Sequence, residues 1–190
     1  CALLTSITVD ENNANFSSNE DGILFNKDKS VLICCPAGKE GDCEVPSGVT
    51  TIGNNAFSNC VKLQSVTIPV SVTTIGEETF AGCENVNLIV EPGSKAHEFA
   101  KTNSIPYIFN GYNEAETAQI EKLTFKEVRN ENSEVIGYSV FSCDKEISGA
   151  LNIPATYNGK PVIEIGSFVF EDCTALSAVT IPKSVTTIGA

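Results

Sequence analysis

The sequence is poor in several residue types that support chemistry or recognition. It has no Met, no Trp, four Tyr and a single His in 190 residues. Its 12 basic side chains stand against 24 acidic ones, which gives a formal net charge of −12. That excess repels phosphate backbones, so nucleic acid is excluded as an expected partner. No apolar run approaches the roughly 20 residues that span a bilayer, and we therefore expect no insertion into a membrane.

Motifs of catalysis and cofactor binding are missing as well. The sequence contains no HExxH, no GxSxG and no Gly-rich phosphate loop. His97 falls in a polar segment that is expected to be helical, where a solvated side chain is the simplest interpretation. A zinc site needs four well-placed ligands, and Cys34 and Cys35 with Cys43 lack the usual pair spacing. We expect no enzymatic activity, no cofactor and no bound metal.

What the sequence does have is a repeat with a period of 23 residues. Residues 45–67 match residues 68–90 position by position. Copies of the pattern Val-Thr-Thr-Ile-Gly begin at Val49 and Val72, and another begins at Val185. A fixed period in this range predicts a solenoid of stacked coils, because a single unit cannot bury its apolar face alone.

Each unit is expected to hold two short strands, a turn and a one-turn helical or irregular segment. Residues 66–68 alternate apolar and polar side chains, as a half-buried strand does. Val72 and Ile75 are expected to point inward on either side of the outward pair at residues 73–74. Stacking then places each position on its counterpart one coil away.

The patterns Val-Thr-Ile-Pro-x-x-Val-Thr-Thr-Ile-Gly and Phe-x-x-Cys-x-x-Leu resemble the BspA-type leucine-rich repeat. The resemblance implies a leucine-rich-repeat solenoid with parallel β-strands on one face, and an extracellular or cell-surface location within a larger protein. It also implies adhesion or protein binding, with a host or matrix protein, or a glycan, as the partner. The alternative is a structural spacer, or a carrier module for an attached enzyme or a carbohydrate-degrading assembly.

Two interruptions of the period divide the chain into two arrays. Residues 1–109 are expected to form the C-terminal part of a first array, which closes with a capping helix at about 95–102. Ser94 is the expected N-cap of that helix. Residues 110–117 have the polar, Gly-containing composition of a linker, and residues 118–190 begin a second array.

Three segments that depart from the repeat are expected to form hairpins or turns. Residues 22–33 hold two apolar runs around a polar turn, and residues 123–141 hold two alternating runs of the same kind. Residues 157–161, Tyr-Asn-Gly-Lys-Pro, predict a protruding turn.

Both ends of the sequence fall within a repeat. Cys1 aligns with Cys60, and Ala190 comes one residue after an Ile-Gly pair. From this we expect a fragment of a longer protein, in which incomplete coils present apolar faces and strand edges. Such faces would favour end-to-end self-association.

The exposed sheet is the surface that we expect to bind a partner. Its outward threonines recur at equivalent positions, although branched side chains favour a sheet for packing reasons alone. Tyr157 adds an aromatic side chain in the protruding turn. The candidate binding residues are Thr50, Thr51, Thr67, Thr73, Thr74, Thr180, Thr186, Thr187 and Tyr157.

Eight cysteines raise the question of disulfide bonds. Four occupy one repeat position, namely Cys1, Cys60, Cys83 and Cys173. Side chains stacked in register run parallel, which is poor disulfide geometry, so these four are expected to be buried free thiols. The other four are Cys34, Cys35, Cys43 and Cys143. A bridge from Cys34 or Cys35 to Cys43 remains open.

Overall fold

The computed structural model describes residues 2–189 and divides the chain into two compact units, one that ends at Asn110 and one that begins at Gly111. The first unit contains β1 (Phe16–Ser18), β2 (Leu24–Asn26), β3 (Val31–Cys34), β4 (Gly41–Glu44), β5 (Thr51–Ile52), β6 (Leu63–Ile68), β7 (Thr74–Ile75), β8 (Asn87–Val90), α1 (Lys95–Thr102) and β9 (Tyr107–Phe109). The second contains α2 (Glu114–Ile120), β10 (Leu123–Arg129), β11 (Val135–Cys143), β12 (Gly149–Asn152), β13 (Thr156–Tyr157), β14 (Lys160–Ile165), β15 (Leu176–Thr180) and β16 (Thr187–Ile188).

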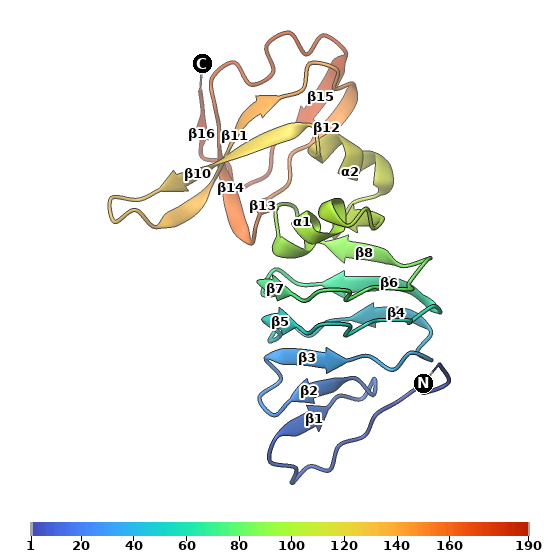
Figure 1. Cartoon of the computed structure of the whole chain (residues 1–190). Helices are drawn as coiled ribbons and strands as arrows, with labels where there is room; N and C mark the ends of the chain where they lie inside the picture. The colour runs from blue at the N-terminus through green and yellow to red at the C-terminus, as the bar shows by residue number, and fades with distance from the viewer. Residues whose placement is uncertain (1, 190) are drawn as a thin grey trace. The chain divides into compact units, whose positions relative to one another are not determined.

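The first unit is a solenoid in which each coil supplies one strand to each of two ladders (Figure 1). The longer ladder runs β4-β6-β8-β9, and every pair in it is parallel. The shorter ladder runs β3-β5-β7, also parallel, and the antiparallel strands β1 and β2 extend it. Buried Leu32, Ile52, Val66 and Leu88 belong to the core of the coils. The predicted leucine-rich-repeat solenoid of stacked parallel strands is confirmed.

The segment between the two strands of a coil is built from turns in place of a helical turn. Asn55 and Glu78 hold equivalent positions and both adopt left-handed backbone, with φ of 55° and 53°. Phe168 holds the same position in the second unit, with φ of 59°. Backbone hydrogen bonds join these turns as well, such as the one from the Phe57 nitrogen to the Thr79 oxygen at 2.9 Å. Neighbouring coils are therefore bonded around most of their perimeter, and not only along the strands.

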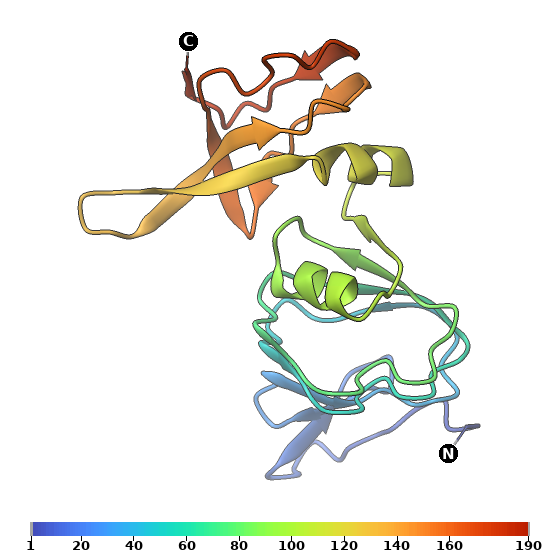
Figure 2. The same cartoon turned by 45° about the horizontal axis from the view of Figure 1, so that its top comes forward.

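Helix α1 closes the first unit, as the sequence predicts. Ser94 is its N-cap and accepts a hydrogen bond from the His97 nitrogen at 3.2 Å. Ala96 and Ala100 are fully buried, and the Phe99 ring lies 6.1 Å from the Phe80 ring between centroids. Figure 2 shows the helix lying over the coils. The helix thus covers apolar surface that the last repeat would otherwise expose.

The interpretation of His97 as a solvated side chain is wrong. The residue is only 8% exposed, and its ring lies 4.9 Å from the Phe109 ring and 5.0 Å from the Tyr107 ring between centroids. Gly93 donates its backbone N–H to His97 Nδ1 at 3.1 Å. Strand β9 follows the helix and supplies both aromatic rings, which a reading of the helix alone does not reveal.

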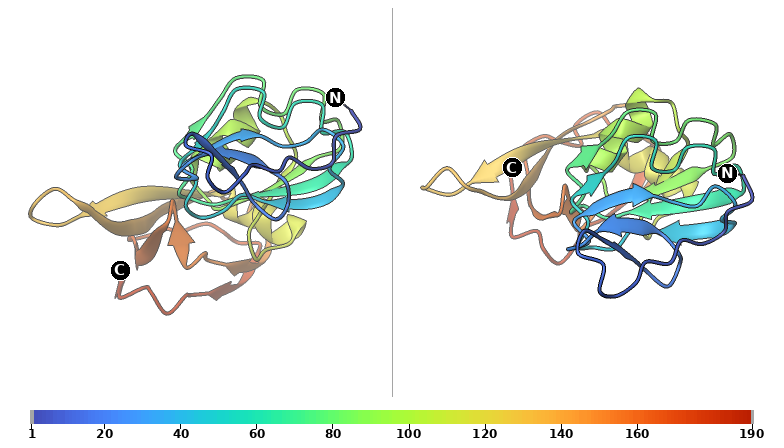
Figure 3. Two further views of the ribbon diagram at one scale, coloured as in Figure 1. Left: turned by 90° about the horizontal axis from the view of Figure 1, so that it is seen from below. Right: turned by 60° about the horizontal axis from the view of Figure 1, so that its bottom comes forward.

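After α2, the second unit forms the predicted hairpin. Strands β10 and β11 pair antiparallel, and β11 then pairs parallel with β14, which pairs in turn with β16. The β10–β11 hairpin reaches well beyond the rest of its unit (Figure 3). A second ladder pairs β12 with β15 in parallel. The core includes fully buried Val140, Ile147, Leu151 and Val162.

The structure differs from the linker expected at 110–117. Residues 114–117 form the first part of α2, whose N-cap Asn113 exchanges hydrogen bonds with Glu116 in a capping box. Ile120 is buried, and Gln119 Nε2 donates to the Ser148 oxygen at 2.7 Å. The polar composition of this segment includes the capping pattern Asn-x-x-Glu, which starts a helix where a linker was expected.

Stacking of equivalent aromatic rings predicts a large stability cost at one core position. The Phe57 side chain is fully buried and lies parallel to the Phe80 ring at 5.1 Å between centroids. Phe57→Ala should lower the free energy of unfolding of the first unit by about 3–5 kcal/mol, because it opens a cavity between two coils. Phe16→Ala is the control, since that ring is 44% exposed, and it should cost about 0.5 kcal/mol. Chemical denaturation measures both; equal costs would contradict the stacked-core account.

Candidate binding surface

The structure does not bring the candidate binding residues into one site. Thr50, Thr51, Thr73 and Thr74 lie on or beside the short ladder of the first unit, whereas Thr67 lies on β6 in the long ladder. Thr180, Thr186, Thr187 and Tyr157 belong to the second unit. Thr67 is half-buried between Glu44 and Ile89 of the neighbouring strands. The single threonine face expected from the period is therefore divided among separate surfaces.

Three of the threonine hydroxyl groups are used between coils. Thr50 Oγ1 donates to the Ser30 oxygen at 3.3 Å, and Thr73 Oγ1 donates to the Thr50 oxygen at 3.4 Å. Thr186 Oγ1 makes the same contact with the Ile163 oxygen at 3.3 Å. These side chains are exposed, but their polar groups already support the stacking of one coil on the next.

Tyr157 is packed against its own unit and does not project as a free aromatic platform. Its ring stacks on Phe125 at 4.1 Å between centroids and meets the edge of Tyr138 at 4.9 Å. The expected turn is present as a hairpin in which Tyr157 pairs with Lys160. The ring therefore covers the core side of β10 and β11, a packing role that the turn composition did not indicate.

A continuous row of polar side chains crosses the sheet of the second unit. The strand register aligns Lys126 of β10 with Ser139 of β11, then with Glu164 of β14 and Thr187 of β16. Ser139 Oγ lies 3.4 Å from Glu164 Oε1. One candidate from the sequence, Thr187, thus belongs to a row whose other members the repeat does not single out.

Phe141 lies two residues after Ser139 on β11, so it faces the same side of the sheet as this row. Thr124 pairs with Ser142 and Phe125 pairs with Val140, which leaves Phe141 without a partner on β10. The Phe141 side chain is 50% exposed, and Lys126 Nζ lies 3.8 Å from its ring centroid. The bulge at Phe141 therefore leaves this aromatic ring without a cross-strand neighbour on β10, on a polar surface.

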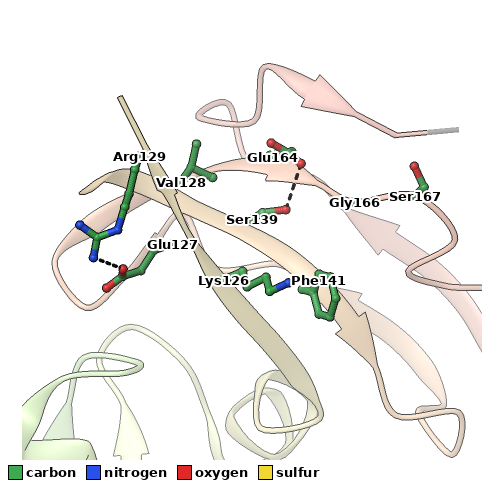
Figure 4. Close-up of a pocket in the computed structure, with 9 residues that line it drawn as sticks. All are labelled: Lys126, Glu127, Val128, Arg129, Ser139, Phe141, Glu164, Gly166 and Ser167. Carbon is green, nitrogen blue, oxygen red and sulfur yellow. Dashed lines mark hydrogen bonds and ion pairs between the residues drawn. The ribbon is translucent and has the colours of Figure 1, made fainter. Parts of the chain in front are cut away.

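The row and the bulge border a groove of about 540 Å³, which we call the hairpin groove (Figure 4). Its charged groups are balanced, with two basic and two acidic side chains, although the chain as a whole carries −12. Arg129 forms an ion pair with Glu127 at one end. The hairpin groove is lined by Lys126, Glu127, Val128, Arg129, Ser139, Phe141, Glu164, Gly166 and Ser167.

The polar groups of the hairpin groove are engaged with one another. Ser139 is the buried hydroxyl, and its hydrogen-bonding neighbours are Glu164 and the Val140 carbonyl oxygen. An activated nucleophile needs a base that is itself oriented by a third group, and the lining residues do not provide that arrangement. Among residues 2–189, no three His, Cys, Asp or Glu side chains converge in a way that could hold a metal ion. Nor does any described helix have the length and apolar character to cross a membrane.

The cysteines that the structure describes all carry free thiols. Cys60 and Cys173 are buried as the repeat predicts, Cys83 is half-buried, and Cys1 lies outside the described residues. Cys35 and Cys43 are close enough to perturb each other's pKa, and they are not joined covalently. The pKa of Cys35 is raised because its thiol donates to Cys43 and Cys60, and burial adds to the effect.

The stacked parallel coils, the turns between their strands and the capping helix define a leucine-rich-repeat solenoid. The model of the BspA type leucine-rich repeat region matches residues 41–190 with six copies, and the chain belongs to this family. No match is found among curated proteins. The residues that recur in the six copies are those of the core and the turns, so family membership alone does not locate a binding site.

Solved leucine-rich-repeat structures resemble the chain at low identity. A leucine-rich repeat protein from Eubacterium ventriosum ATCC 27560 is 21% identical, over 97% of this chain and 50% of that one, with a TM-score of 0.43. A leucine-rich cell surface protein from Faecalibacterium prausnitzii A2-165 is 22% identical, over 97% and 44%, with a TM-score of 0.43. The pneumococcal vaccine antigen PcpA is 16% identical, over 98% and 45%, with the same TM-score. The chain spans about half the length of these proteins.

The packing of Tyr157 leads to a prediction that separates a structural role from a binding role. Tyr157→Ala should lower the free energy of unfolding of the second unit by about 2 kcal/mol, because Phe125 and Tyr138 lose their ring contacts. Tyr157→Phe keeps the ring and should retain most of that stability. Chemical denaturation, with hydrogen exchange of the amides in β10 and β11 as the probe, measures the change in the free energy of unfolding. An unchanged stability in Tyr157→Ala would contradict the packing role.

Proposed function

We propose that the chain is a non-catalytic protein-binding module of a cell-surface or secreted protein, and that it acts in adhesion to a host or matrix protein. The observation that carries this proposal is the hairpin groove, where a half-exposed Phe141 lies beside a polar row that crosses four strands. An exposed aromatic ring among hydrogen-bonding groups is a common centre of protein interfaces.

The charge pattern favours docking on the face of the sheet over addition of a strand to its edge. Strand β10 lies at the edge of its sheet and carries Lys126, Glu127 and Arg129. Charged side chains on an edge strand discourage pairing with another chain. The adjoining face offers a groove with paired cations and anions, which suits a folded protein surface with both signs of charge.

The chemistry of the groove also favours a protein over a glycan as the expected partner. Glycan sites usually present open aromatic faces, but here the Lys126 ammonium already lies over the Phe141 ring, and Tyr157 is stacked on Phe125. A protein partner can draw Lys126 away from the Phe141 ring, either by packing an aromatic ring of its own on Phe141 or by pairing a carboxylate with Lys126. We therefore place protein before glycan.

A binding screen tests the proposed function. The chain is measured against immobilised extracellular-matrix proteins, mucins and a glycan array, and we expect saturable binding to a protein that persists at moderate salt. The double variant Phe141→Ala with Lys126→Ala should weaken that binding at least about tenfold, since it removes the aromatic anchor and the cation beside it.

A matched control uses the same residue types in the first unit. Phe16 is 44% exposed and Lys95 is an exposed lysine of α1, so Phe16→Ala with Lys95→Ala should leave the affinity within about twofold. An equal loss of affinity in both double variants would show that the hairpin groove is not the binding site. The absence of binding to any probe, with the fold intact, would favour the structural spacer.

We also propose that the second unit associates with a second copy of the chain through an apolar hollow of about 380 Å³. Phe168 is 72% exposed and Ile188 is 60% exposed at this hollow. Its floor includes Ile165 and Phe170, at the repeat positions that Ile52 and Phe57 occupy in the first unit. These positions pack coil against coil there, so the hollow matches the surface of another coil of the same repeat.

Association through this hollow should depend on concentration and on its exposed residues. Phe168→Asn with Ile188→Thr should shift the light-scattering mass of concentrated solutions towards the monomer. Asn is tolerated at residue 168, because the equivalent Asn55 already adopts the left-handed backbone. A wild-type chain that stays monomeric at millimolar concentration would contradict self-association without bearing on the hairpin groove.

A further inference from the structure

The two units share a local arrangement that the 23-residue period does not reveal. In each, an antiparallel hairpin leads into a strand that pairs in parallel with the following coil, β3 with β5 and β11 with β14. Leu32 is aligned with Ile52 in the first unit, and Val140 is aligned with Ile165 in the second. The strands that leave the two hairpins can therefore be aligned with one another, Leu32 with Val140 and Ile52 with Ile165.

Matching backbone contacts support this alignment. The Gly53 nitrogen donates to the Leu32 oxygen at 2.9 Å, and the Gly166 nitrogen donates to the Val140 oxygen at 2.9 Å. A Cβ placed on either glycine would lie 3.3 Å from the same carbonyl oxygen that the nitrogen contacts. Equal distances at both glycines show that the two junctions have the same local geometry.

The alignment makes Cys35 and Cys143 equivalent to one another. Each lies three residues after the aligned hairpin residue, Leu32 or Val140. Cys60 and Cys173 are equivalent in the same way, since each lies eight residues after Ile52 or Ile165. Cys35 and Cys143, which do not share the repeat position of Cys60 and Cys173, thus occupy one defined position in the hairpin coils.

In both units the two thiols meet at a single carbonyl oxygen. Cys35 Sγ and Cys60 Sγ lie 3.9 and 3.7 Å from the Pro36 oxygen. Cys143 Sγ and Cys173 Sγ lie 3.4 and 3.9 Å from the Asp144 oxygen. In each pair the neighbouring thiol also contributes to a raised pKa, that of Cys35 in the first unit and that of Cys143 in the second. In each unit, the sulfur atom of the hairpin coil therefore lies close to the sulfur atom of the coil that follows it.

We propose that Cys35–Cys60 and Cys143–Cys173 are equivalent oxidation sites, at which a small disulfide such as cystine or glutathione disulfide closes one protein disulfide in each unit. One thiolate attacks the small disulfide, which forms a mixed disulfide and releases one small thiol. The second thiol loses its proton and displaces the other small thiol. Two protein thiols are oxidised and one small disulfide is reduced to two thiols.

The two pairs differ in how a small reagent can reach them. The hydrogen bond with Cys35 lowers the pKa of the Cys60 thiol, but both thiols of this pair are buried, so a small disulfide reaches them only when the coil opens locally. In the second unit, burial and the hydrogen bond to Cys173 raise the pKa of Cys143 to about 12. Cys143 is half-buried, however, so a small reagent can approach that pair from solvent.

Cys43 is the main competitor of Cys60 for a disulfide with Cys35. It shares a hydrogen bond with Cys35, and strand register makes it the counterpart of Leu151 in the second unit. The second unit has no competitor at that position, so it tests the equivalence of the pairs without interference. Cys83 is a natural control, because its thiol donates to the Phe57 oxygen at 3.0 Å and has no place in either proposed pair.

The experiment treats the reduced full chain with glutathione disulfide, blocks remaining thiols with N-ethylmaleimide and maps linked tryptic peptides by mass spectrometry. We expect one link between peptides 130–145 and 146–183 and another between peptides 30–39 and 40–62. The melting temperature should rise after oxidation and return to its starting value with dithiothreitol, because each link closes a loop of the unfolded chain.

Variants identify the pairs, because Cys43 and Cys60 fall on one tryptic peptide. The first-unit link should persist in Cys43→Ala and Cys34→Ala and be lost in Cys60→Ala. The second-unit link should be lost in Cys173→Ala and persist in Cys83→Ala. A first-unit link that survives in Cys60→Ala but is lost in Cys43→Ala would overturn the proposed equivalence. Failure of Cys143 and Cys173 to link under conditions that oxidise the unfolded chain would overturn the proposal as a whole.

Discussion

The structure depends on backbone hydrogen bonding between consecutive coils in a fixed register. This bonding runs through both ladders of the first unit and also through the turns between them, as the contact from Phe57 to Thr79 shows. A coil that slipped by one residue would turn its buried isoleucines outward and lose both sets of bonds at once. Register therefore dictates which side chains can stack. It brings Phe57 onto Phe80 and aligns Thr51 with Thr74, and it explains why the core residues repeat while much of the surface does not.

The same register constrains the turns through backbone conformation more than through residue type. The equivalent left-handed positions hold Asn55, Glu78 and Phe168, three side chains with nothing chemical in common. Asn tolerates this backbone best, and a bulky side chain there carries a conformational cost. At Asn55 the turn is bonded to the following coil, where the Asn55 nitrogen donates to the Glu77 oxygen at 3.0 Å. Phe168 adopts the same backbone with its side chain mostly exposed.

The fold could be predicted from the sequence because the repeat reports the register directly. The period indicates the inward residues, the two strands of each coil and the helix that covers Phe80. It fails where the chain departs from the repeat. The capping box at Asn113 is a local signal hidden in a polar segment, and the burial of His97 depends on a strand that follows later in the chain. The bulge that leaves Phe141 without a partner on β10 is not disclosed by alternation of side chains along one strand. Candidate binding residues chosen from the period were accordingly dispersed, since recurrent threonines follow the needs of stacking.

This contrast bears on where a solenoid of this kind can carry specific recognition. A side chain that recurs in every coil has a structural reason to recur, as the hydroxyl bonds of Thr50, Thr73 and Thr186 illustrate. Recognition requires residues whose identity is not dictated by the stacking of coils but whose position is fixed by attachment to the stack. The β10–β11 hairpin meets both conditions, because one of its strands is anchored to β14 by parallel pairing while the other carries its own pattern of charge. The paired cysteines lie at the same kind of junction, after the hairpin and before the regular coil. Irregular segments fixed to a regular stack are therefore the places where this fold gains chemistry that its repeat does not encode.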